Sequence, residues 1–76
     1  MTIKEIANIY DDNEQIVLLS GDVNRPNRHY TGRLCNTPDA LLNSQIDFVS
    51  AMPESRRKKW NLNRYGWTEI WIDKEN

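Results

Sequence analysis

The residues best suited to chemistry gather in one segment, where cations alternate with large aromatic side chains. Cations neutralise phosphates and aromatic rings stack on bases at about 1–3 kcal/mol each, so this composition suits single-stranded nucleic acid. Arg28, His29 and Arg33 could extend such a patch. The alternative is a solvated loop whose aromatic rings fold back onto the protein beneath arginine stems. The segment contains Arg56, Arg57, Lys58, Lys59, Trp60, Arg64, Tyr65 and Trp67.

The strand predicted over residues 67–73 is apolar on both of its faces. In an extended chain successive side chains point to opposite sides, which places Trp67 and Trp71 on one face and Ile70 on the other. A half-exposed sheet would carry polar residues where these tryptophans stand. They either form a second small core or anchor a partner, and a homodimer would do both. The candidate anchors are Trp60, Tyr65, Trp67 and Trp71.

Residues for catalysis or metal binding are few, and we expect no enzyme, no metal and no cofactor. His29 and Cys35 are the only soft ligands, whereas structural zinc requires four. A calcium loop beginning at Asp11 would need glycine where Ile16 stands. No nucleophile–base pair or glycine-rich phosphate loop is present in the sequence.

Length, cysteine content and charge limit the kinds of protein that this chain can be. A chain of 76 residues is one small domain whose core supplies about 3–5 kcal/mol, so dimerisation or tight aromatic packing is expected to stabilise it. A single cysteine and the lack of a long apolar run predict a soluble cytoplasmic protein with no membrane contact. Residues 1–22 carry a net charge of −4 and residues 23–66 carry +5, which indicates separate acidic and basic surfaces.

The hydrophobic patterns predict a single α+β domain over residues 1–76. Its four-stranded sheet is expected to be antiparallel, with the first and last strands adjacent in the middle because both are apolar on two faces. The first helix would cover one face, and the tryptophan face would be covered by residues 53–66 or by a partner. The predicted elements are a helix over 2–10, strands over 15–20 and 29–34, a short helix over 36–42, strands over 45–51 and 67–73, and a polar, basic connection over 53–66.

The arrangement of these patterns resembles small uncharacterised proteins from phages and prophages of Gram-positive bacteria. The resemblance implies a short cytosolic protein that binds a host or defence protein, or touches nucleic acid, and it transfers no binding residue. The basic segment and the tryptophans depart from the plainer, more acidic pattern of those proteins. The residues that carry the resemblance are Ile3, Ile6, Ile9–Asp12, Ile16–Leu18, Tyr30–Gly32, Thr37–Leu42, Ile46, Val49 and Glu69–Ile72.

Together these features predict a non-enzymatic interaction protein, encoded by a mobile element, that binds and inhibits a host or defence macromolecule. Its aromatic residues would fill pockets on the partner while the cations steer association. The alternative is a small nucleic-acid-binding protein that uses the same residues between 56 and 67.

Overall fold

Four strands form one mixed sheet in which the last strand of the chain occupies a central position. The computed structural model describes residues 1–11, 13–63 and 66–73. The strand order is β2-β1-β4-β3, with antiparallel pairing of β1 with β2 and of β3 with β4, and parallel pairing of β1 with β4. The strands are β1 (Gln15–Asp22), β2 (Arg25–Arg33), β3 (Ile46–Ala51) and β4 (Thr68–Ile72).

The predicted α+β class, the four strands and the central β1–β4 pair are confirmed, and most of the sheet is antiparallel as predicted. The central pair differs, because Leu18 lies beside Ile70 in a parallel register. The prediction rested on apolar alternation, which shows that a strand is buried on two faces but carries no information about its direction.

The first helix, α1 (Ile3–Ile6), begins with a capping box. The Thr2 hydroxyl accepts the Glu5 N–H, and the Glu5 carboxylate accepts the Thr2 N–H. The helix is shorter than the predicted 2–10, because the Asn8 and Ile9 N–H groups bond carbonyls three residues back rather than four, and Ile9 is 67% exposed. The short helix predicted over 36–42 is instead two 3₁₀ turns, η1 (Leu34–Asn36) and η2 (Asp39–Leu41).

One face of the sheet packs against α1 and the 3₁₀ turns. The buried side chains of this main core come from α1, η1, β1 and β4, and they alternate along the two strands, as period-two burial requires. They are Ile3, Ile6, Ile16, Leu18, Leu34, Ile70 and Ile72.

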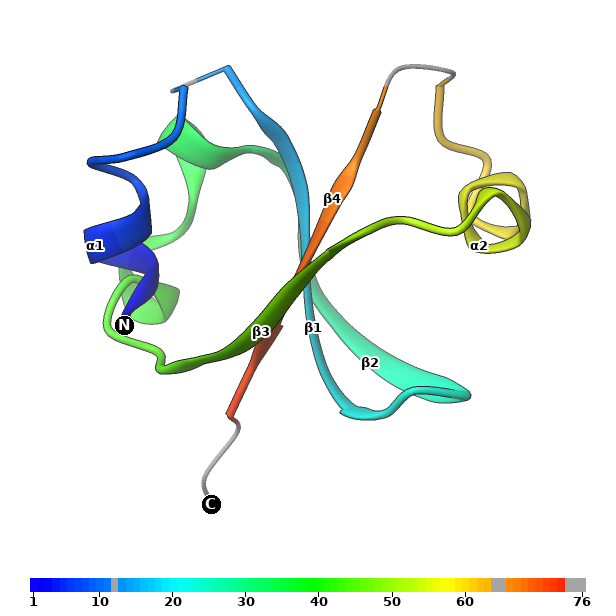
Figure 1. Cartoon of the computed structure of the whole chain (residues 1–76), viewed down its shortest axis with the longest axis horizontal. Coiled ribbons are helices and arrows are strands. Elements are labelled where there is room, and N and C mark those ends of the chain that lie inside the picture. The colour runs from blue at the N-terminus through cyan, green and yellow to red at the C-terminus, as the bar shows by residue number, and fades with distance from the viewer. Residues whose placement is uncertain (12, 64–65, 74–76) are drawn as a thin grey trace.

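The opposite face is covered by a second helix, α2 (Glu54–Lys59), which lies within the polar, basic connection predicted over 53–66. Figure 1 shows the sheet between α1 on one side and α2 on the other. Pro53 occupies the N-cap position, Glu54 lies in the first turn and cations fill the last turn, so the charges complement the helix dipole. Within the described residues no helix is long and apolar enough to cross a membrane.

The β1–β2 hairpin is tied at its turn and irregular at its middle. The Asp22 carboxylate accepts the Asn24 N–H at 2.8 Å, which closes the turn. The register shifts between Leu18 and Leu19, so His29 is an extra residue on β2. At Gly32 an added Cβ would lie 2.7 Å from the Tyr30 hydroxyl, so only a glycine leaves this tyrosine in place.

Candidate interaction surface

A continuous row of aromatic rings and arginines crosses the sheet face beneath α2. The rings of Phe48 and Trp71 stack with centroids 5.4 Å apart and planes 13° from parallel. The Arg56 guanidinium carbon lies 5.7 Å from the Trp71 ring and 6.0 Å from the Trp60 ring, and that of Arg28 lies 4.7 Å from Trp60. We call these five residues the aromatic–arginine row. Such guanidinium–ring contacts are attractive because the ring face is electron-rich.

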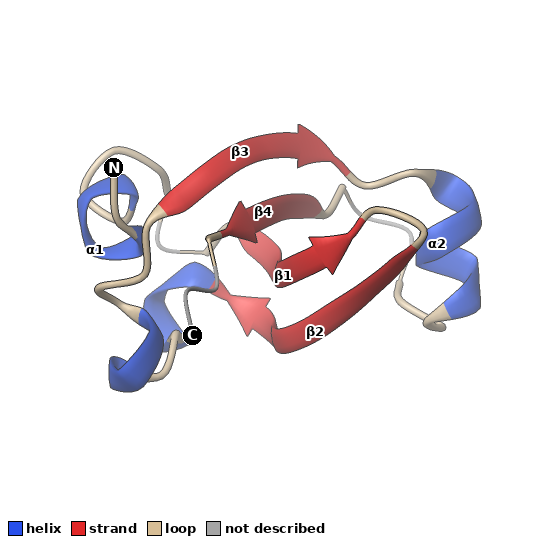
Figure 2. Ribbon diagram, turned by 90° about the horizontal axis from the view of Figure 1, so that it is seen from below, coloured by secondary structure: helices blue, strands red, loops and turns tan. Residues whose placement is uncertain are grey.

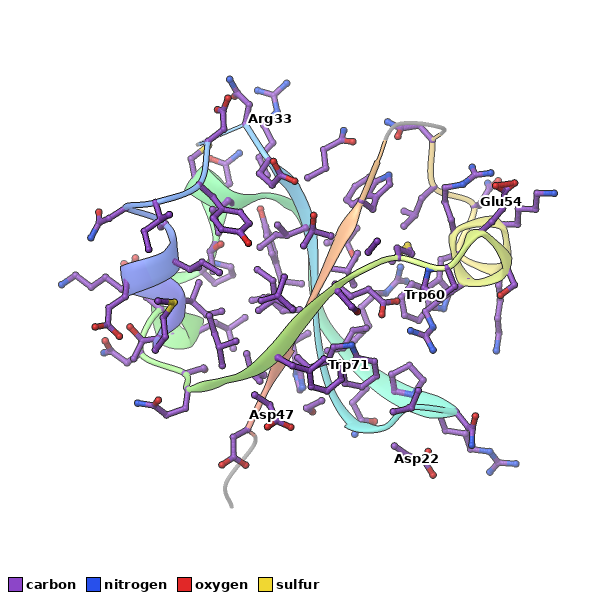
Figure 3. All side chains as sticks on the ribbon, in the orientation of Figure 1. Asp22, Arg33, Asp47, Glu54, Trp60 and Trp71 are labelled. Atoms are coloured by element: carbon purple, nitrogen blue, oxygen red, sulfur yellow. The ribbon has the colours of Figure 1, made fainter. Side chains whose placement is uncertain are left out.

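The strand register explains why the row forms. Phe48 on β3 pairs with Trp71 on β4, Trp71 pairs with Leu19 on β1, and Leu19 pairs with Arg28 on β2. Paired residues share a face, so one line of side chains runs across all four strands. Helix α2 and the residue after it then lay Arg56 and Trp60 over this line, and Figure 3 shows Trp60 and Trp71 on the side that α2 covers.

A nearly buried ion pair holds α2 on the sheet. The Glu69 carboxylate, 2% exposed as a residue, accepts hydrogen bonds from the Arg56 guanidinium and, at 3.2 Å, from the Trp71 indole N–H. Arg56 also donates to the Val23 carbonyl at 2.8 Å, which links the helix to the hairpin turn. One arginine therefore connects α2, β4 and the β1–β2 turn, and both charges are paired as burial demands.

The buried part of the row is a second small core. Trp71 is 3% exposed and clusters with Val17 and Leu19. Partly buried side chains pack around them, and the indole N–H of one, Trp67, donates to the Asn63 side chain at 3.0 Å. In this structure Trp71 is therefore a core residue of the single chain rather than an exposed anchor. The partly buried residues are Met52, Trp60, Leu62 and Trp67.

The two ends of the row remain open to solvent. Phe48 is 45% exposed although its ring rests on the buried Trp71, and Arg28 is exposed above Trp60. Val23, at the turn that Arg56 holds, is 55% exposed. These residues leave an apolar and cationic surface, which we call the interaction surface, around a rigid aromatic base.

The cations predicted to form one basic patch separate into two groups. Arg56 is engaged in the buried ion pair, and Arg57 donates to the carbonyls of Leu62 and Asn63 at 3.1 and 3.3 Å. Lys58 and Lys59 are exposed, and the Lys58 ammonium lies 3.9 Å from the Glu54 carboxylate. Of the remaining predicted site residues, Arg64 and Tyr65 lie outside the described residues.

Sequence reasoning did not single out Phe48 or Glu69. Alternation places Phe48 opposite Val49, which is the signal that a second apolar face continues onto β3, and the register shift between Ile46 and Phe48 turns Ile46 to the Val49 side. The signal for Glu69 is a lone acid inside an apolar strand, because such a charge must find a cationic partner.

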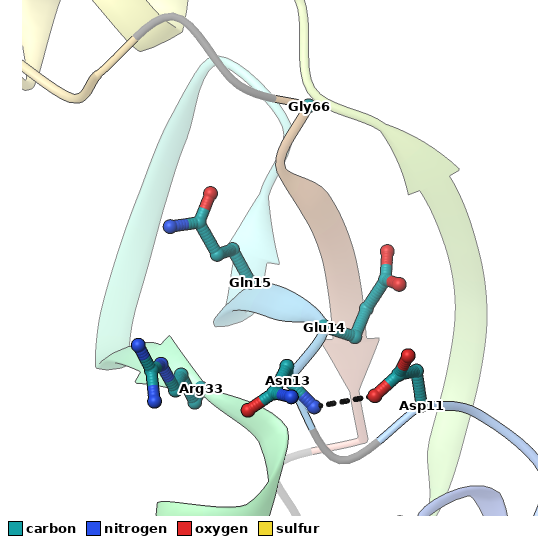
Figure 4. A pocket seen from close by; sticks show the side chains of 6 residues that line it. All are labelled: Asp11, Asn13, Glu14, Gln15, Arg33 and Gly66. Carbon is teal, nitrogen blue, oxygen red and sulfur yellow. Dashed lines mark hydrogen bonds between the residues drawn. The ribbon is translucent and has the colours of Figure 1, made fainter.

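A shallow polar pocket lies at the other end of the sheet, between the start of β1 and the end of β2 (Figure 4). The Asn13 N–H donates to the Asp11 carboxylate at 2.9 Å, and Glu14 accepts from the Thr68 hydroxyl at 3.0 Å. Across the part of the chain that the structure describes, no three His, Cys, Asp or Glu residues gather as a metal site. The lining residues are Asp11, Asn13, Glu14, Gln15, Arg33 and Gly66.

The comparisons with known proteins assign no family. No family model matches the chain, and no curated protein or solved structure matches it at the significance required. The geometry of the interaction surface is therefore the basis of the functional proposal.

Proposed function

We propose that this chain is a non-enzymatic interaction protein that binds another protein through the interaction surface. The observation that carries the proposal is Phe48, a large aromatic side chain 45% exposed yet held flat on buried Trp71. An immobilised ring loses little conformational entropy on binding, and aromatic and arginine residues dominate the energetics of protein interfaces. The row thus supplies a rigid apolar anchor at one end and the Arg28 guanidinium at the other.

The charges around the anchor suggest an acidic partner. Three cations are exposed here: Arg28 on β2, at one end of the row, and Lys58 and Lys59 on α2. Such cations at the rim accelerate association with an acidic surface and contribute less to its lifetime. The resemblance to small phage proteins makes a cytoplasmic host or defence protein the expected target, which this chain would inhibit by steric occlusion.

The test compares two exposed apolar residues in different places on the molecule. Phe48→Ser removes the anchor, whereas Ile9→Ser removes an apolar side chain that is more exposed and follows α1. Immobilised wild-type protein and both variants would be incubated with host lysate, and the retained proteins quantified by mass spectrometry. We expect one partner to be retained by the wild type and Ile9→Ser and lost from Phe48→Ser. Equal retention by all three would contradict the proposal.

The nucleic-acid alternative is tested with the same proteins. Labelled single- and double-stranded oligonucleotides would be titrated at low and moderate salt, with fluorescence polarisation as the readout. Two of the four described cations between 56 and 59 make hydrogen bonds within the chain, so we expect weak binding at most. Micromolar binding that falls steeply with salt would instead support a nucleic-acid function.

A further inference from the structure

The outer strand β2 presents a long free edge. It spans nine residues, stands at the end of the strand order and pairs only with β1 among the described strands. Figure 2 shows β2 along the margin of the sheet, with no described element beside its outer side. The main-chain N–H and C=O groups on such an edge are available to another extended chain.

The charge on this edge has a single sign. Arg25, Arg28 and Arg33 are all exposed, and β2 contains no acidic residue. The opposite edge strand, β3, is shorter and carries only Asp47 as a charge. The two margins of one sheet therefore differ in length and in electrostatic sign.

We propose that the β2 edge binds an acidic, extended segment of a partner protein, which adds to the sheet as a fifth strand. In this mode main-chain hydrogen bonds supply affinity and alternate side chains supply specificity. The inference goes beyond the proposed function: it shares Arg28 with the interaction surface, but it concerns the main-chain edge of β2 and does not depend on Phe48.

The register shows which side chains the added strand would meet. Arg28 pairs with Leu19, Thr31 with Val17 and Arg33 with Gln15, so all three β2 residues share the α2 side of the sheet. An incoming strand also alternates, and carboxylates at every second position would line up with this row of two arginines. The spacing thus selects an alternating acidic and apolar segment rather than a uniformly acidic one.

The same cations disfavour pairing between two copies of β2. Like charges across a new strand pair are destabilising, and proteins commonly place charges on edges to prevent self-association. An acidic strand reverses the sign of that interaction. The cations on this edge therefore repel a second copy of β2 and attract an acidic partner strand.

An extended peptide fits this edge better than a nucleic acid does. Apart from Pro26, which has no main-chain N–H, the edge that the described residues leave unpaired offers both donors and acceptors, which match a strand, whereas phosphates only accept hydrogen bonds. Three arginines spread over nine residues are also a sparse charge density for a phosphate chain. Nucleic acid is nonetheless included in the test.

The probe is a fluorescein-labelled peptide of alternating glutamate and valine, about six residues long like an ordinary strand. Three control probes are the same peptide with alternate main-chain nitrogens methylated, a lysine–valine peptide, and labelled oligothymidine. Fluorescence polarisation gives the dissociation constants. The amide spectrum of ¹⁵N-labelled protein reports whether β2 or β3 is perturbed.

We expect the glutamate–valine peptide to bind with shifts confined to β2 and neighbouring residues, and methylation to abolish binding. The paired variant Arg28→Glu with Arg33→Glu, which reverses both arginines on the α2 side of β2, should weaken binding at least about tenfold, because opposed charges become like charges. Lys4→Glu, which reverses an exposed cation on α1, should leave it unchanged. Phe48→Ser should also bind the peptide normally, which separates this inference from the proposed function.

Three results would overturn the inference. Equal binding of the methylated peptide would mean that charge alone attracts the probe. Amide shifts centred on β3 would mean that the peptide binds the opposite edge of the sheet. Tighter binding of oligothymidine than of the peptide would mean that the cations bind phosphates. Because methylation alters only the peptide, this arm remains informative even if the charge-reversed protein fails to fold.

Discussion

The Arg56–Glu69 pair provides a quantitative test of how α2 is held. Arg56→Met removes the cation and leaves the Glu69 carboxylate, 2% exposed, with the Trp71 indole N–H at 3.2 Å as its one hydrogen-bond donor among the described side chains. Breaking a buried pair in this way costs about 3–5 kcal/mol, because an uncompensated charge remains. A domain of this size has about 3–5 kcal/mol in total, so the variant should be largely unfolded.

The companion variants separate the charge from the contacts. Glu69→Gln preserves a carbonyl acceptor for Trp71 and leaves Arg56 partly exposed and bonded to Val23, so we expect a loss of about 1–2 kcal/mol. Combining Glu69→Gln with Arg56→Met removes the buried charge altogether. The double variant should regain about 2 kcal/mol relative to Arg56→Met alone. From most to least stable, the expected order is then wild type, Glu69→Gln, the double variant and Arg56→Met.

Urea unfolding followed by tryptophan fluorescence and far-ultraviolet circular dichroism gives each free energy, in a constant concentration of a stabilising osmolyte so that the weakest variant folds. Arg57→Met is the matched control. Arg57 donates hydrogen bonds to main-chain carbonyls, and its ion pair is a weak one, with the guanidinium 3.7 Å from the exposed Glu54 carboxylate. It should cost about 1 kcal/mol. Equal costs for the two arginine variants, or no recovery in the double variant, would refute the reasoning.

Three further changes test local contacts. Gly32→Ala would place a Cβ 2.7 Å from the Tyr30 hydroxyl, displace its 2.6 Å hydrogen bond to the Arg33 carbonyl and lower the free energy of unfolding by about 1–2 kcal/mol in urea titrations. Thr31→Val should raise that free energy by up to about 1 kcal/mol, because the buried Thr31 hydroxyl oxygen has no hydrogen-bond partner among the described residues. Burial, and secondarily the charge of Cys35, raise the pKa of Tyr30, so its stabilisation is present below the ordinary phenol range near about 10 and is lost as pH rises through the raised pKa. Ultraviolet titration against Tyr30→Phe checks this, and a phenol that titrates at an ordinary pKa would contradict it.

The capping carboxylate of α1 has the opposite pH dependence. The hydrogen bond from the Thr2 main-chain N–H, with a smaller contribution from the Thr2 side chain, lowers the pKa of Glu5. Its stabilisation is therefore present above the ordinary carboxyl range near about 4.3 and is lost as pH falls through the lowered pKa. Carbon-detected NMR titration of the Glu5 carboxyl measures this directly, and Glu5→Gln provides the control without a titrating group.

The faces of the central strands were predictable because alternation is a local property. Ile70 and Trp71 lie in different clusters, as strict period-two placement requires. The sequence patterns allow either residues 53–66 or a partner to cover Trp71, because they do not by themselves predict α2. Its signals were nevertheless present, with Pro53 and Glu54 at its start and cations in its last turn. The cluster of cations favoured a binding segment over a helix end.

Other features depend on contacts between distant segments. The parallel β1–β4 pairing follows from how the two antiparallel pairs meet, which no local pattern encodes. The engagement of Arg56 depends likewise on Glu69 and on the Val23 carbonyl, and the latter lies 33 positions away. Sequence composition identified the cations, but only the fold separates a structural arginine from the exposed lysines beside it.

The place of β4 has a consequence for the order of assembly. The strands on either side of β4, β1 and β3, both precede it in the chain. An N-terminal segment that ends before β4 therefore lacks the strand that joins the two halves of the sheet. Until residues 68–72 arrive, Val17 and Leu19 lack the buried Trp71 as a packing partner and β1 offers an open, apolar edge. During synthesis the nascent chain would therefore remain unable to close its core until its last strand leaves the ribosome, and folding should occur in a single late, cooperative step.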